Sequence, residues 1–321
     1  MRAVFAQSSS ATDPLSALAV GELDGAPGPD GWVKVTLRAS ALNHHDLFSL
    51  QGVGLPAGRL PMVLGCDGAG VDGDGNEVIV HAVVASPGWR GDETLDPHRS
   101  LLSEIHPGTM ADSVWVPAGN TVPKPAALGW EEAACLPTAW LTAFKMLFTV
   151  SPAGPGSTIL VQGAGGGVST ALVAMGARAG FRVWVTGRSQ AKRDGALALG
   201  ADAVFEPGAR LPGRVDVVFD SVGEATWAHS LRSLKPGGAI VTCGATSGFN
   251  PPAELNRVFF TQLQVLGSTM GNRTELAALV QFLATTGLRP QIDTVLPLER
   301  AREGFAMLLA GDVSGKIVFT H

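Results

Sequence analysis

The sequence is poor in several residue types and patterns, and each shortage argues against a class of protein. Its three cysteines, Cys66, Cys135 and Cys243, are too few and too scattered for a disulfide framework or a Cys-x-x-Cys metal pair. The sequence has no run of about 18 apolar residues, which a helix needs to cross a bilayer, and its N-terminus lacks the apolar core of a secretory signal. The net charge of −5, with no Lys/Arg cluster, argues against nucleic-acid binding. We therefore expect a cytoplasmic protein with no membrane or nucleic-acid partner.

Two stretches with different secondary-structure patterns indicate two domains. The chain has 321 residues, and 45% of them are hydrophobic, which is enough for two cores. The first third alternates short strands with Gly/Pro turns, which predicts a β-rich, barrel-like domain with strands at 3–6, 32–39, 77–84 and 113–116. After a helical stretch at 130–148, strands at 158–161, 182–186, 215–219 and 239–243 alternate with helices near 168–179, 190–199 and 224–234. This alternation predicts a doubly wound α/β domain with a parallel sheet.

The end of the chain returns to a different pattern. Ala301, Phe305, Leu308 and Leu309 fall on one face of an expected helix, and an apolar strand follows at 316–320. We expect a core helix and a closing strand.

The most informative motif is the glycine-rich stretch that follows the strand at 158–161. Gly163, Gly165, Gly166 and Gly167 allow a tight turn, and a helix that begins near Val168 would aim its N-terminus at a pyrophosphate. The third glycine of the strict fingerprint is replaced by Ser169. A glycine pattern alone is weak evidence, but the strand, helix and second strand around it favour a dinucleotide site.

The residues after the second strand favour NADP(H) over NAD(H). An NAD site usually places a carboxylate there for the ribose 2′-hydroxyl, but this chain has Gly187, Arg188 and Ser189. A guanidinium can bind a 2′-phosphate with two hydrogen bonds, Ser189 adds a neutral donor, and Lys192 adds a second cation.

Taken together, the motifs resemble those of the medium-chain dehydrogenase/reductase superfamily, in its zinc-independent, quinone-oxidoreductase-like branch. The resemblance spans nearly the whole chain and rests on the order of motifs at 41–46 (ALNHHD), 65–70 (GCDGAG), 106–112 (HPGTMAD), 136–143 (LPTAWLTA), 220–223 (DSVG), 234–238 (LKPGG) and 314–318 (SGKIV). It implies a GroES-like catalytic domain at 1–121, a Rossmann domain for NADP(H) at 122–265 and a C-terminal segment at 266–321 that completes the catalytic domain.

The resemblance also allows a test for zinc. Zinc-dependent relatives carry Cys, His and Cys or Asp as ligands, whereas the matching positions here are Asn43, Cys66 and Thr138. An amide and a hydroxyl are poor zinc ligands, and the loop 87–108 lacks the four cysteines of a structural zinc lobe. We therefore expect no metal. One alternative stays open, an unorthodox site built from Cys66, Cys135 and either His44 or His45.

Without a metal, the negative charge that develops on the substrate must be stabilised by hydrogen-bond donors. Some metal-free reductases of the superfamily use a tyrosine as proton donor, but this chain has no tyrosine. The resemblance leaves Asn43 to orient the substrate or nicotinamide, His45 at the proton-relay position, and Asp46 to orient its neighbours. Each of these three could instead have only a packing or turn-forming role.

Further cofactor contacts follow from the resemblance. It places His44 near the pyrophosphate, Thr138 near the floor of the active site and Lys316 near the cofactor. Two alternatives stay open: Thr138 could instead serve merely as a helix cap, and Lys316 could instead be a solvated charge at the end of a strand. The loops after the later strands add Ser221, Val222, Cys243, Gly244, Ala245, Ser268 and Met270.

These observations predict an NADPH-dependent, metal-free enzyme that reduces a quinone or an α,β-unsaturated carbonyl compound. The alternatives are a zinc-type alcohol dehydrogenase with unorthodox ligands and a catalytically silent NADPH-binding sensor. The resemblance also implies a homodimer that pairs through an edge strand within 259–266.

Overall fold

The computed structural model describes residues 1–25 and 27–321, which form two compact units. Unit 1 comprises Met1–Leu141 and Gly271–His321, and unit 2 comprises Thr142–Met270. The boundaries fall at 141/142 and 270/271, whereas the sequence suggested 121/122 and 265/266. The first difference arises because Trp130–Ala134, which we assigned to the Rossmann domain, packs on strands of unit 1.

Unit 1 is built around a curved, mostly antiparallel sheet. Within the described residues its strand order is β10-β6-β5-β3-β18-β17, with β9 paired to β3, and smaller sheets β2-β1-β4 and β7-β8 lie beside it. The strands are β1 (Arg2–Ala6), β2 (Leu18–Glu22), β3 (Trp32–Ala41), β4 (Met62–Val63), β5 (Asp67–Val71), β6 (Glu77–Val80), β7 (Val83–Val84), β8 (Ser100–Leu101), β9 (Ser113–Pro117), β10 (Thr121–Pro123), β17 (Ile292–Pro297) and β18 (Lys316–Thr320). This is the expected β-rich, GroES-like domain.

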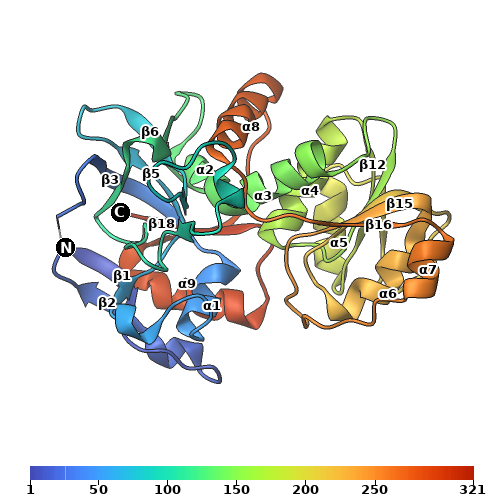
Figure 1. Cartoon of the computed structure of the whole chain (residues 1–321), viewed down its shortest axis with the longest axis horizontal. Coiled ribbons are helices and arrows are strands. Elements are labelled where there is room, and N and C mark those ends of the chain that lie inside the picture. Colours follow the sequence, from blue (N-terminus) through green and yellow to red (C-terminus); the bar gives the residue numbers. More distant parts are fainter. Residues whose placement is uncertain (26) are drawn as a thin grey trace. The chain divides into compact units, whose positions relative to one another are not determined.

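The C-terminal strand β18 completes this sheet (Figure 1). It pairs antiparallel with β3, where Val318 faces Ala41, and parallel with β17. Strand β3 alternates buried and exposed residues in its middle and is fully buried from Ala39 to Ala41, where β5 and β18 flank it. The last residues of the chain therefore lie beside the motif that begins at Ala41.

Helices cover unit 1 on several sides. They are α1 (His44–Leu50), α2 (Trp130–Ala134), α8 (Arg273–Thr286) and α9 (Ala301–Ala310), with short helical segments η1 (Pro14–Ala17), η2 (Ala57–Arg59), η3 (Glu93–Leu95), η4 (Ala118–Asn120), η5 (Leu136–Trp140) and η7 (Leu298–Arg300). Helix α8 begins with a capping box between Asn272 and Glu275 and ends at Gly287, whose φ of 69° suits glycine. In α9, Ala301 and Phe305 are buried as expected, but Leu309 is 48% exposed and does not belong to the core face.

Unit 2 has a parallel sheet with the strand order β13-β12-β11-β14-β15-β16, the arrangement of a Rossmann fold. The strands are β11 (Thr158–Val161), β12 (Arg182–Thr186), β13 (Ala203–Phe205), β14 (Val215–Asp220), β15 (Leu234–Thr242) and β16 (Gln264–Gly267). The helices are α4 (Gly167–Arg178), α5 (Gln190–Ala198), α6 (Glu224–Ser233) and α7 (Leu255–Phe260). Helix α4 packs against β11 and β12, α5 packs against β12 and β13, and α6 packs against β14 and β15 (Figure 1).

Two expected elements have different bounds. The helical stretch 130–148 is divided into α2, η5, α3 (Leu141–Phe144) and η6 (Lys145–Val150), and Pro137 lies where η5 follows α2. A proline removes a helical hydrogen bond and disfavours a regular helix. The edge strand expected within 259–266 is β16, which begins only at Gln264, and Phe259 and Phe260 belong to α7.

No helix within the described part of the chain is long and apolar enough to span a membrane.

Candidate functional site

The glycine-rich loop of unit 2 connects β11 to α4, and its glycines allow side chains of neighbouring segments to approach its backbone closely. Gly163 and Gly165 have φ values of 85° and 96°, which favour glycine over other residues. A Cβ atom on Gly165 would lie 2.7 Å from Cδ of Lys192, and one on Gly163 would lie 3.1 Å from Cγ2 of Val222. Helix α4 begins at Gly167, so its unpaired N–H groups lie at the end of this loop. The loop therefore has the local structure of a pyrophosphate site.

Ser169, which replaces the third glycine of the fingerprint, is accommodated inside the first turn of α4. Its side chain is buried, and its Oγ donates to the carbonyl of Gly166 at 2.9 Å. The substitution therefore keeps the turn closed.

A buried polar network fixes the strand ends below the loop. Oε1 of Gln162 accepts from Oγ1 of Thr186 at 2.6 Å, and Nε2 donates to Oγ of Ser230 at 3.0 Å. Ser230 in turn donates to Asp220 at 2.7 Å. Since Gln162 directly follows β11 and the other three residues come from β12, α6 and β14, the network holds the carboxyl edge of the sheet in one arrangement.

The turn after β12 presents the residues expected to recognise a 2′-phosphate. Arg188 and Ser189 are both exposed. Oγ of Ser189 accepts from the backbone N–H of Lys192 at 3.3 Å and caps α5, which leaves the hydroxyl hydrogen available to a ligand. The stem of Lys192 lies over Gly165, so the cation belongs to the same corner of unit 2.

The other cofactor residues expected in unit 2 lie after its later strands. Ser221 and Val222 follow β14 and are half-buried. The segment from Cys243 to Ala245 follows β15, and burial raises the pKa of the Cys243 thiol to about 12. Ser268 and Met270 follow β16; Oγ of Ser268 is buried without a hydrogen-bond partner in the described residues.

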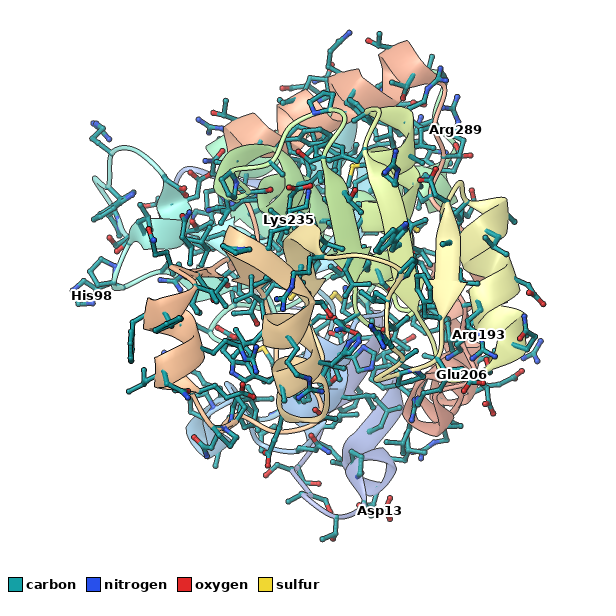
Figure 2. The ribbon with its side chains drawn as sticks, turned by 90° about the vertical axis from the view of Figure 1, so that its right-hand side faces the viewer. Asp13, His98, Arg193, Glu206, Lys235 and Arg289 are labelled. Atoms are coloured by element: carbon teal, nitrogen blue, oxygen red, sulfur yellow. The ribbon has the colours of Figure 1, made fainter. Side chains whose placement is uncertain are left out.

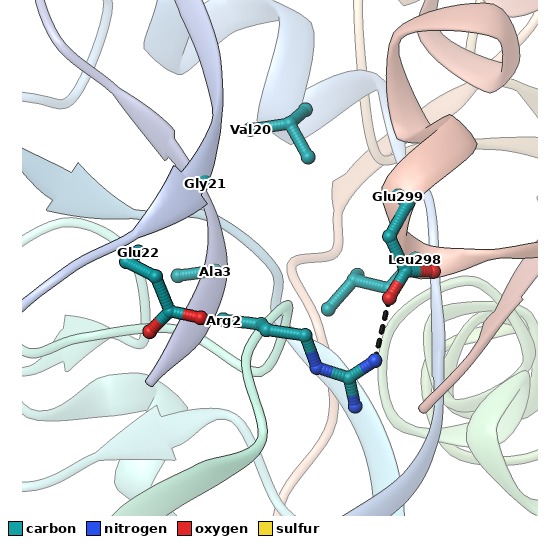
Figure 3. A pocket seen from close by; sticks show the side chains of 7 residues that line it. All are labelled: Arg2, Ala3, Val20, Gly21, Glu22, Leu298 and Glu299. Atoms are coloured by element: carbon teal, nitrogen blue, oxygen red, sulfur yellow. Dashed lines mark hydrogen bonds and ion pairs between the residues drawn. The ribbon is translucent and has the colours of Figure 1, made fainter.

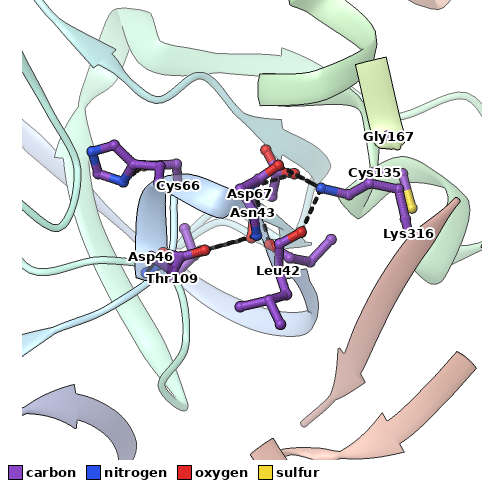
Figure 4. A network of polar contacts seen from close by, with 12 residues as sticks. Leu42, Asn43, Asp46, Cys66, Asp67, Thr109, Cys135, Gly167 and Lys316 are labelled. Atoms are coloured by element: carbon purple, nitrogen blue, oxygen red, sulfur yellow. Dashed lines mark hydrogen bonds and ion pairs between the residues drawn. The ribbon is translucent and has the colours of Figure 1, made fainter. Parts of the chain in front are cut away.

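In unit 1, a buried ion pair organises the start of α1 (Figure 4). Nζ of Lys316 lies 2.9 Å from Oδ2 of Asp67, 2.6 Å from Oδ1 of Asn43 and 2.8 Å from the carbonyl of Leu42. The side chains of Lys316 and Asp67 are 2% and 0% exposed. All three ammonium donors are therefore used within unit 1, so Lys316 is not a solvated strand-end charge, while its expected place near the cofactor stays a prediction.

Asn43 is part of the same network. Its Nδ2 donates to Oδ2 of Asp67 at 2.9 Å and to the carbonyl of Ala41 at 3.3 Å, while its Oδ1 accepts from Lys316. The amide is thus engaged at both ends with protein groups. This arrangement favours a structural role and not the orientation of a substrate.

Asp46 holds the backbone around this turn. Its Oδ2 accepts from the N–H of Asn43 and its Oδ1 from the N–H of Gly65, both at 2.9 Å. The side chain is fully buried, and burial raises the pKa of its carboxyl. Asp46 therefore orients its neighbours and is not placed to exchange a proton.

His45 has a protein partner on each ring nitrogen. Nε2 lies 3.0 Å from Oε1 of Glu104, and Nδ1 lies 3.4 Å from Sγ of Cys66. Because the Cys66 thiol donates its own hydrogen to the carbonyl of Leu102 at 3.2 Å, its sulfur can act as the acceptor toward His45. Both ring nitrogens then carry a hydrogen, as in an imidazolium.

The electrostatic surroundings agree with this hydrogen-bond pattern. Burial by itself lowers the pKa of His45, but Cys66, Glu104 and Asp46 together raise it well above its ordinary value of 6.5. Cys66 makes the largest of these raising contributions, ahead of Glu104 and Asp46, and burial raises the pKa of the Cys66 thiol itself. The side chain of His45 is 21% exposed, so it can still reach a ligand.

Glu104 was not among the residues singled out from the sequence. It lies 59 positions from His45, after β8, in a stretch without a recognisable motif. Its Oε2 accepts from the N–H of Leu101 at 3.2 Å, which orients the carboxylate toward the imidazole.

The positions that correspond to zinc ligands do not fit the metal. The Asn43 amide is engaged with Lys316 and Asp67, and the Cys66 thiol donates to a carbonyl. Oγ1 of Thr138 is buried without a hydrogen-bond partner within residues 1–25 and 27–321, so it does not act as a helix cap. Cys135 donates to the carbonyl of Glu131 at 3.1 Å. In the same described ranges, no three His, Cys, Asp or Glu side chains converge as a metal site.

His44 is the first residue of α1 and is exposed. It belongs to unit 1, as do Thr138 and Lys316.

A small hollow of about 100 Å³ in unit 1 lies apart from these groups (Figure 3). Among the residues that line it, the guanidinium of Arg2 is paired with Glu299 and Asp112, and Glu22 is paired with the N-terminal amine. The charges are therefore used within the protein, and the hollow has no free group for chemistry. It is lined by Arg2, Ala3, Val20, Gly21, Glu22, Leu298 and Glu299.

Comparisons with known proteins agree with both units. Residues 29–126 match the model of the alcohol dehydrogenase GroES-like domain, and residues 167–285 match that of the zinc-binding dehydrogenases. The zinc-type alcohol dehydrogenase-like protein YogA of Leptosphaeria maculans is 31% identical, over 91% of each chain. A crotonyl-CoA carboxylase/reductase of Cereibacter sphaeroides is 27% identical, over 83% of this chain and 74% of that protein. A crystal structure of an NAD-dependent alcohol dehydrogenase superposes over all of both chains with a TM-score of 0.90 and 34% identity. The chain therefore belongs to the medium-chain dehydrogenase/reductase superfamily, as its motifs indicated.

Proposed function

We propose that this oxidoreductase uses NADP(H) to reduce a quinone or an α,β-unsaturated carbonyl compound without a metal ion. The observation that carries the cofactor choice is the exposed Arg188-Ser189 pair at the end of β12, beside the glycine loop. A carboxylate at this place would repel a 2′-phosphate, whereas a guanidinium and a hydroxyl attract it.

In unit 2, different groups bind different parts of the dinucleotide. The N–H groups at the start of α4 face the pyrophosphate, and Arg188, Ser189 and Lys192 bind the 2′-phosphate. Val222, which packs on Gly163, borders the adenosine side of the loop. When bound, NADPH supplies the hydride.

In unit 1, His45 supplies the proton. A substrate that accepts a hydride at carbon must gain a proton at oxygen or at the neighbouring carbon, and an imidazolium is a suitable general acid. Glu104 keeps the ring protonated and fixes its orientation through Nε2. No tyrosine is present to take this role.

Two observations support an activated acceptor over a simple ketone. The groups at the positions of the zinc ligands, an engaged amide and a thiol that donates to a carbonyl, suit zinc poorly, so the proposed reaction does not rely on a Lewis acid to polarise an unactivated carbonyl. Quinones and enones spread the incoming charge over a conjugated system and demand less polarisation. The name of the crotonyl-CoA carboxylase/reductase relative refers to such a conjugated acyl substrate.

A turnover panel tests this proposal. The purified protein is incubated with NADPH and one acceptor at a time: a benzoquinone, a naphthoquinone, an enone, an enoyl thioester and a simple aldehyde. We expect reduction of the conjugated acceptors, with saturated or hydroquinone products identified by mass spectrometry. Reduction of the aldehyde alone, lost on chelation, would favour a zinc alcohol dehydrogenase. NADPH binding without turnover of any acceptor would favour a silent sensor.

We further propose that the chain forms a homodimer through β16. This strand lies at the edge of the parallel sheet and is hydrogen-bonded on one side, to β15, in the described residues. Val265 is 48% exposed, and the neighbouring Phe259 and Phe260 are 68% and 84% exposed. An apolar edge strand of this kind needs a cover, and a second copy of the strand can supply it.

A further inference from the structure

A second arginine lies behind the exposed turn that carries Arg188. Arg193 is in the first part of α5, and only 11% of its side chain is exposed (Figure 2). In the sequence it looks like one more charge on a surface helix. In the structure it is a mostly buried cation whose Nη1 donates to backbone carbonyls.

The guanidinium of Arg193 binds two successive carbonyls of the turn. Nη1 donates to the carbonyl of Gly187 at 2.6 Å and to that of Arg188 at 3.3 Å, and Nη2 donates to Oε1 of Gln190 at 2.8 Å. A planar guanidinium can hold such acceptors in one fixed geometry, which a flexible ammonium cannot do. These contacts draw the carbonyl oxygens of the turn toward the arginine.

The carboxylate near Arg193 is a weak competitor for it. Glu206 lies 3.7 Å away, beside Arg193 in Figure 2, and its side chain is 78% exposed. An exposed pair at this distance contributes little. The positive charge of Arg193 is thus directed mainly at the backbone of the turn.

The same turn is packed directly on the glycine loop. A Cβ atom on Gly187 would lie 2.9 Å from Cβ of Ala164 and 3.1 Å from Cγ of Arg193. The N–H of Ala164 also donates to the carbonyl of Thr186 at 2.7 Å. The stem of Arg193, the turn and the glycine loop therefore pack together, and a shift of the turn would also move the glycine loop proposed for the pyrophosphate.

We propose that Arg193 is a specificity-determining positioning residue, which holds the turn Gly187–Ser189 so that Arg188 and Ser189 face the 2′-phosphate of NADP(H). Carbonyl oxygens turned toward a phosphate would repel it, and Arg193 keeps two of them turned away. The inference rests on the proposed use of NADP(H), but it assigns selectivity to a residue that need not touch the cofactor.

A double-mutant cycle separates positioning from direct contact. Dissociation constants for NADPH and NADH are measured by tryptophan fluorescence for the wild type, Arg193→Met, Arg188→Ala and the double variant. We expect Arg193→Met to reduce the preference for NADPH about tenfold, as the loss of one charge-assisted contact would. In the Arg188→Ala background, the same change should reduce the preference by less than about threefold, because the residue being positioned is already gone. Full additivity, or equal losses for the two cofactors, would overturn the proposal.

Three further measurements keep the test decisive. Arg193→Lys preserves charge and should lose selectivity in the same direction, since the paired donors are missing. Glu206→Gln is the control and should leave both constants unchanged. Hydrogen exchange of the cofactor-free protein should be faster over residues 186–190 in Arg193→Met; unchanged exchange contradicts the positioning role. If the wild type binds NADH and NADPH with equal affinity, the proposed cofactor is refuted, and the selectivity role of Arg193 with it. Faster hydrogen exchange in Arg193→Met would in that case still identify Arg193 as the residue that orders the turn.

Discussion

Nζ of Lys316 and Oδ2 of Asp67 form an ion pair of 2.9 Å inside unit 1, although 249 positions separate the two residues in the sequence. We expect Lys316→Met to lower the free energy of unfolding by about 3–5 kcal/mol, because it leaves a carboxylate buried without its cation. Denaturant unfolding followed by circular dichroism measures the change.

The matched control is Lys235→Met. Lys235 pairs with Asp216 at 2.7 Å, but 47% and 33% of the two side chains are exposed. Loss of this pair should cost less than about 1 kcal/mol. Similar losses for the two variants would show that burial does not set the importance of the Lys316 pair.

Arg188 carries the choice of cofactor in our account. Arg188→Ala should weaken NADPH binding by about 1.5–3 kcal/mol, the range for a hydrogen bond between charged groups, and leave NADH binding nearly unchanged. Isothermal titration calorimetry with each cofactor tests this. The 2′-phosphate assignment is wrong if both cofactors lose the same affinity.

His45 should matter for turnover and not for cofactor binding. His45→Ala removes the proposed general acid, and we expect kcat to fall by about two orders of magnitude or more while the Kd for NADPH stays constant. Single-turnover kinetics at saturating NADPH measures the loss. Wild-type kcat in this variant would remove His45 from the mechanism.

The pH profile tests the role of Glu104. Since the pKa of His45 is raised well above 6.5, kcat/KM should be level through neutral pH and decline as the pH rises through that raised pKa. In Glu104→Gln the pKa of His45 falls, and the decline should begin at lower pH. The pair of His45 and Glu104 also stabilises the folded state, and this stabilisation is fully present below pH 6.5. It disappears as the pH rises through the raised pKa of His45. A profile that does not move in Glu104→Gln would show that the carboxylate does not control His45.

Edge pairing through β16 predicts a change in size. Val265→Asp places a charge on the exposed edge and should convert a dimer into a monomer in light scattering at micromolar concentration. Val295→Asp, at a similarly exposed valine in unit 1, is the control and should leave the mass unchanged. A monomeric wild type, or a Val265→Asp variant that stays dimeric, excludes this interface.

Local patterns predicted most of unit 2 because its signals are short in range. The strands at 158–161 and 182–186 have the expected bounds, since each is a short run rich in β-branched residues with a glycine one or two positions beyond its end. The same kind of local pattern indicated the glycine loop and the residues that we propose for the 2′-phosphate. Arg193 was missed, because its sequence position says nothing of whether a helical arginine faces solvent or the preceding turn.

The site in unit 1 was harder to predict because it depends on contacts between distant segments. His45 was identified by resemblance, but its partners Cys66 and Glu104 come from other loops. Lys316 was expected near the cofactor, which stays a prediction, but no motif indicated that the pairing of β18 with β3 brings it to Asp67 and Asn43. Only the register of these strands determines that contact, and no motif records it.

The most direct test of the central claim is the rate of NADPH and NADH oxidation at 340 nm with one conjugated acceptor, in protein dialysed against a chelator. Our account predicts a much higher kcat/KM with NADPH than with NADH, and no loss of rate after chelation. A rate that depends on added zinc, or that is equal with the two cofactors, would contradict it.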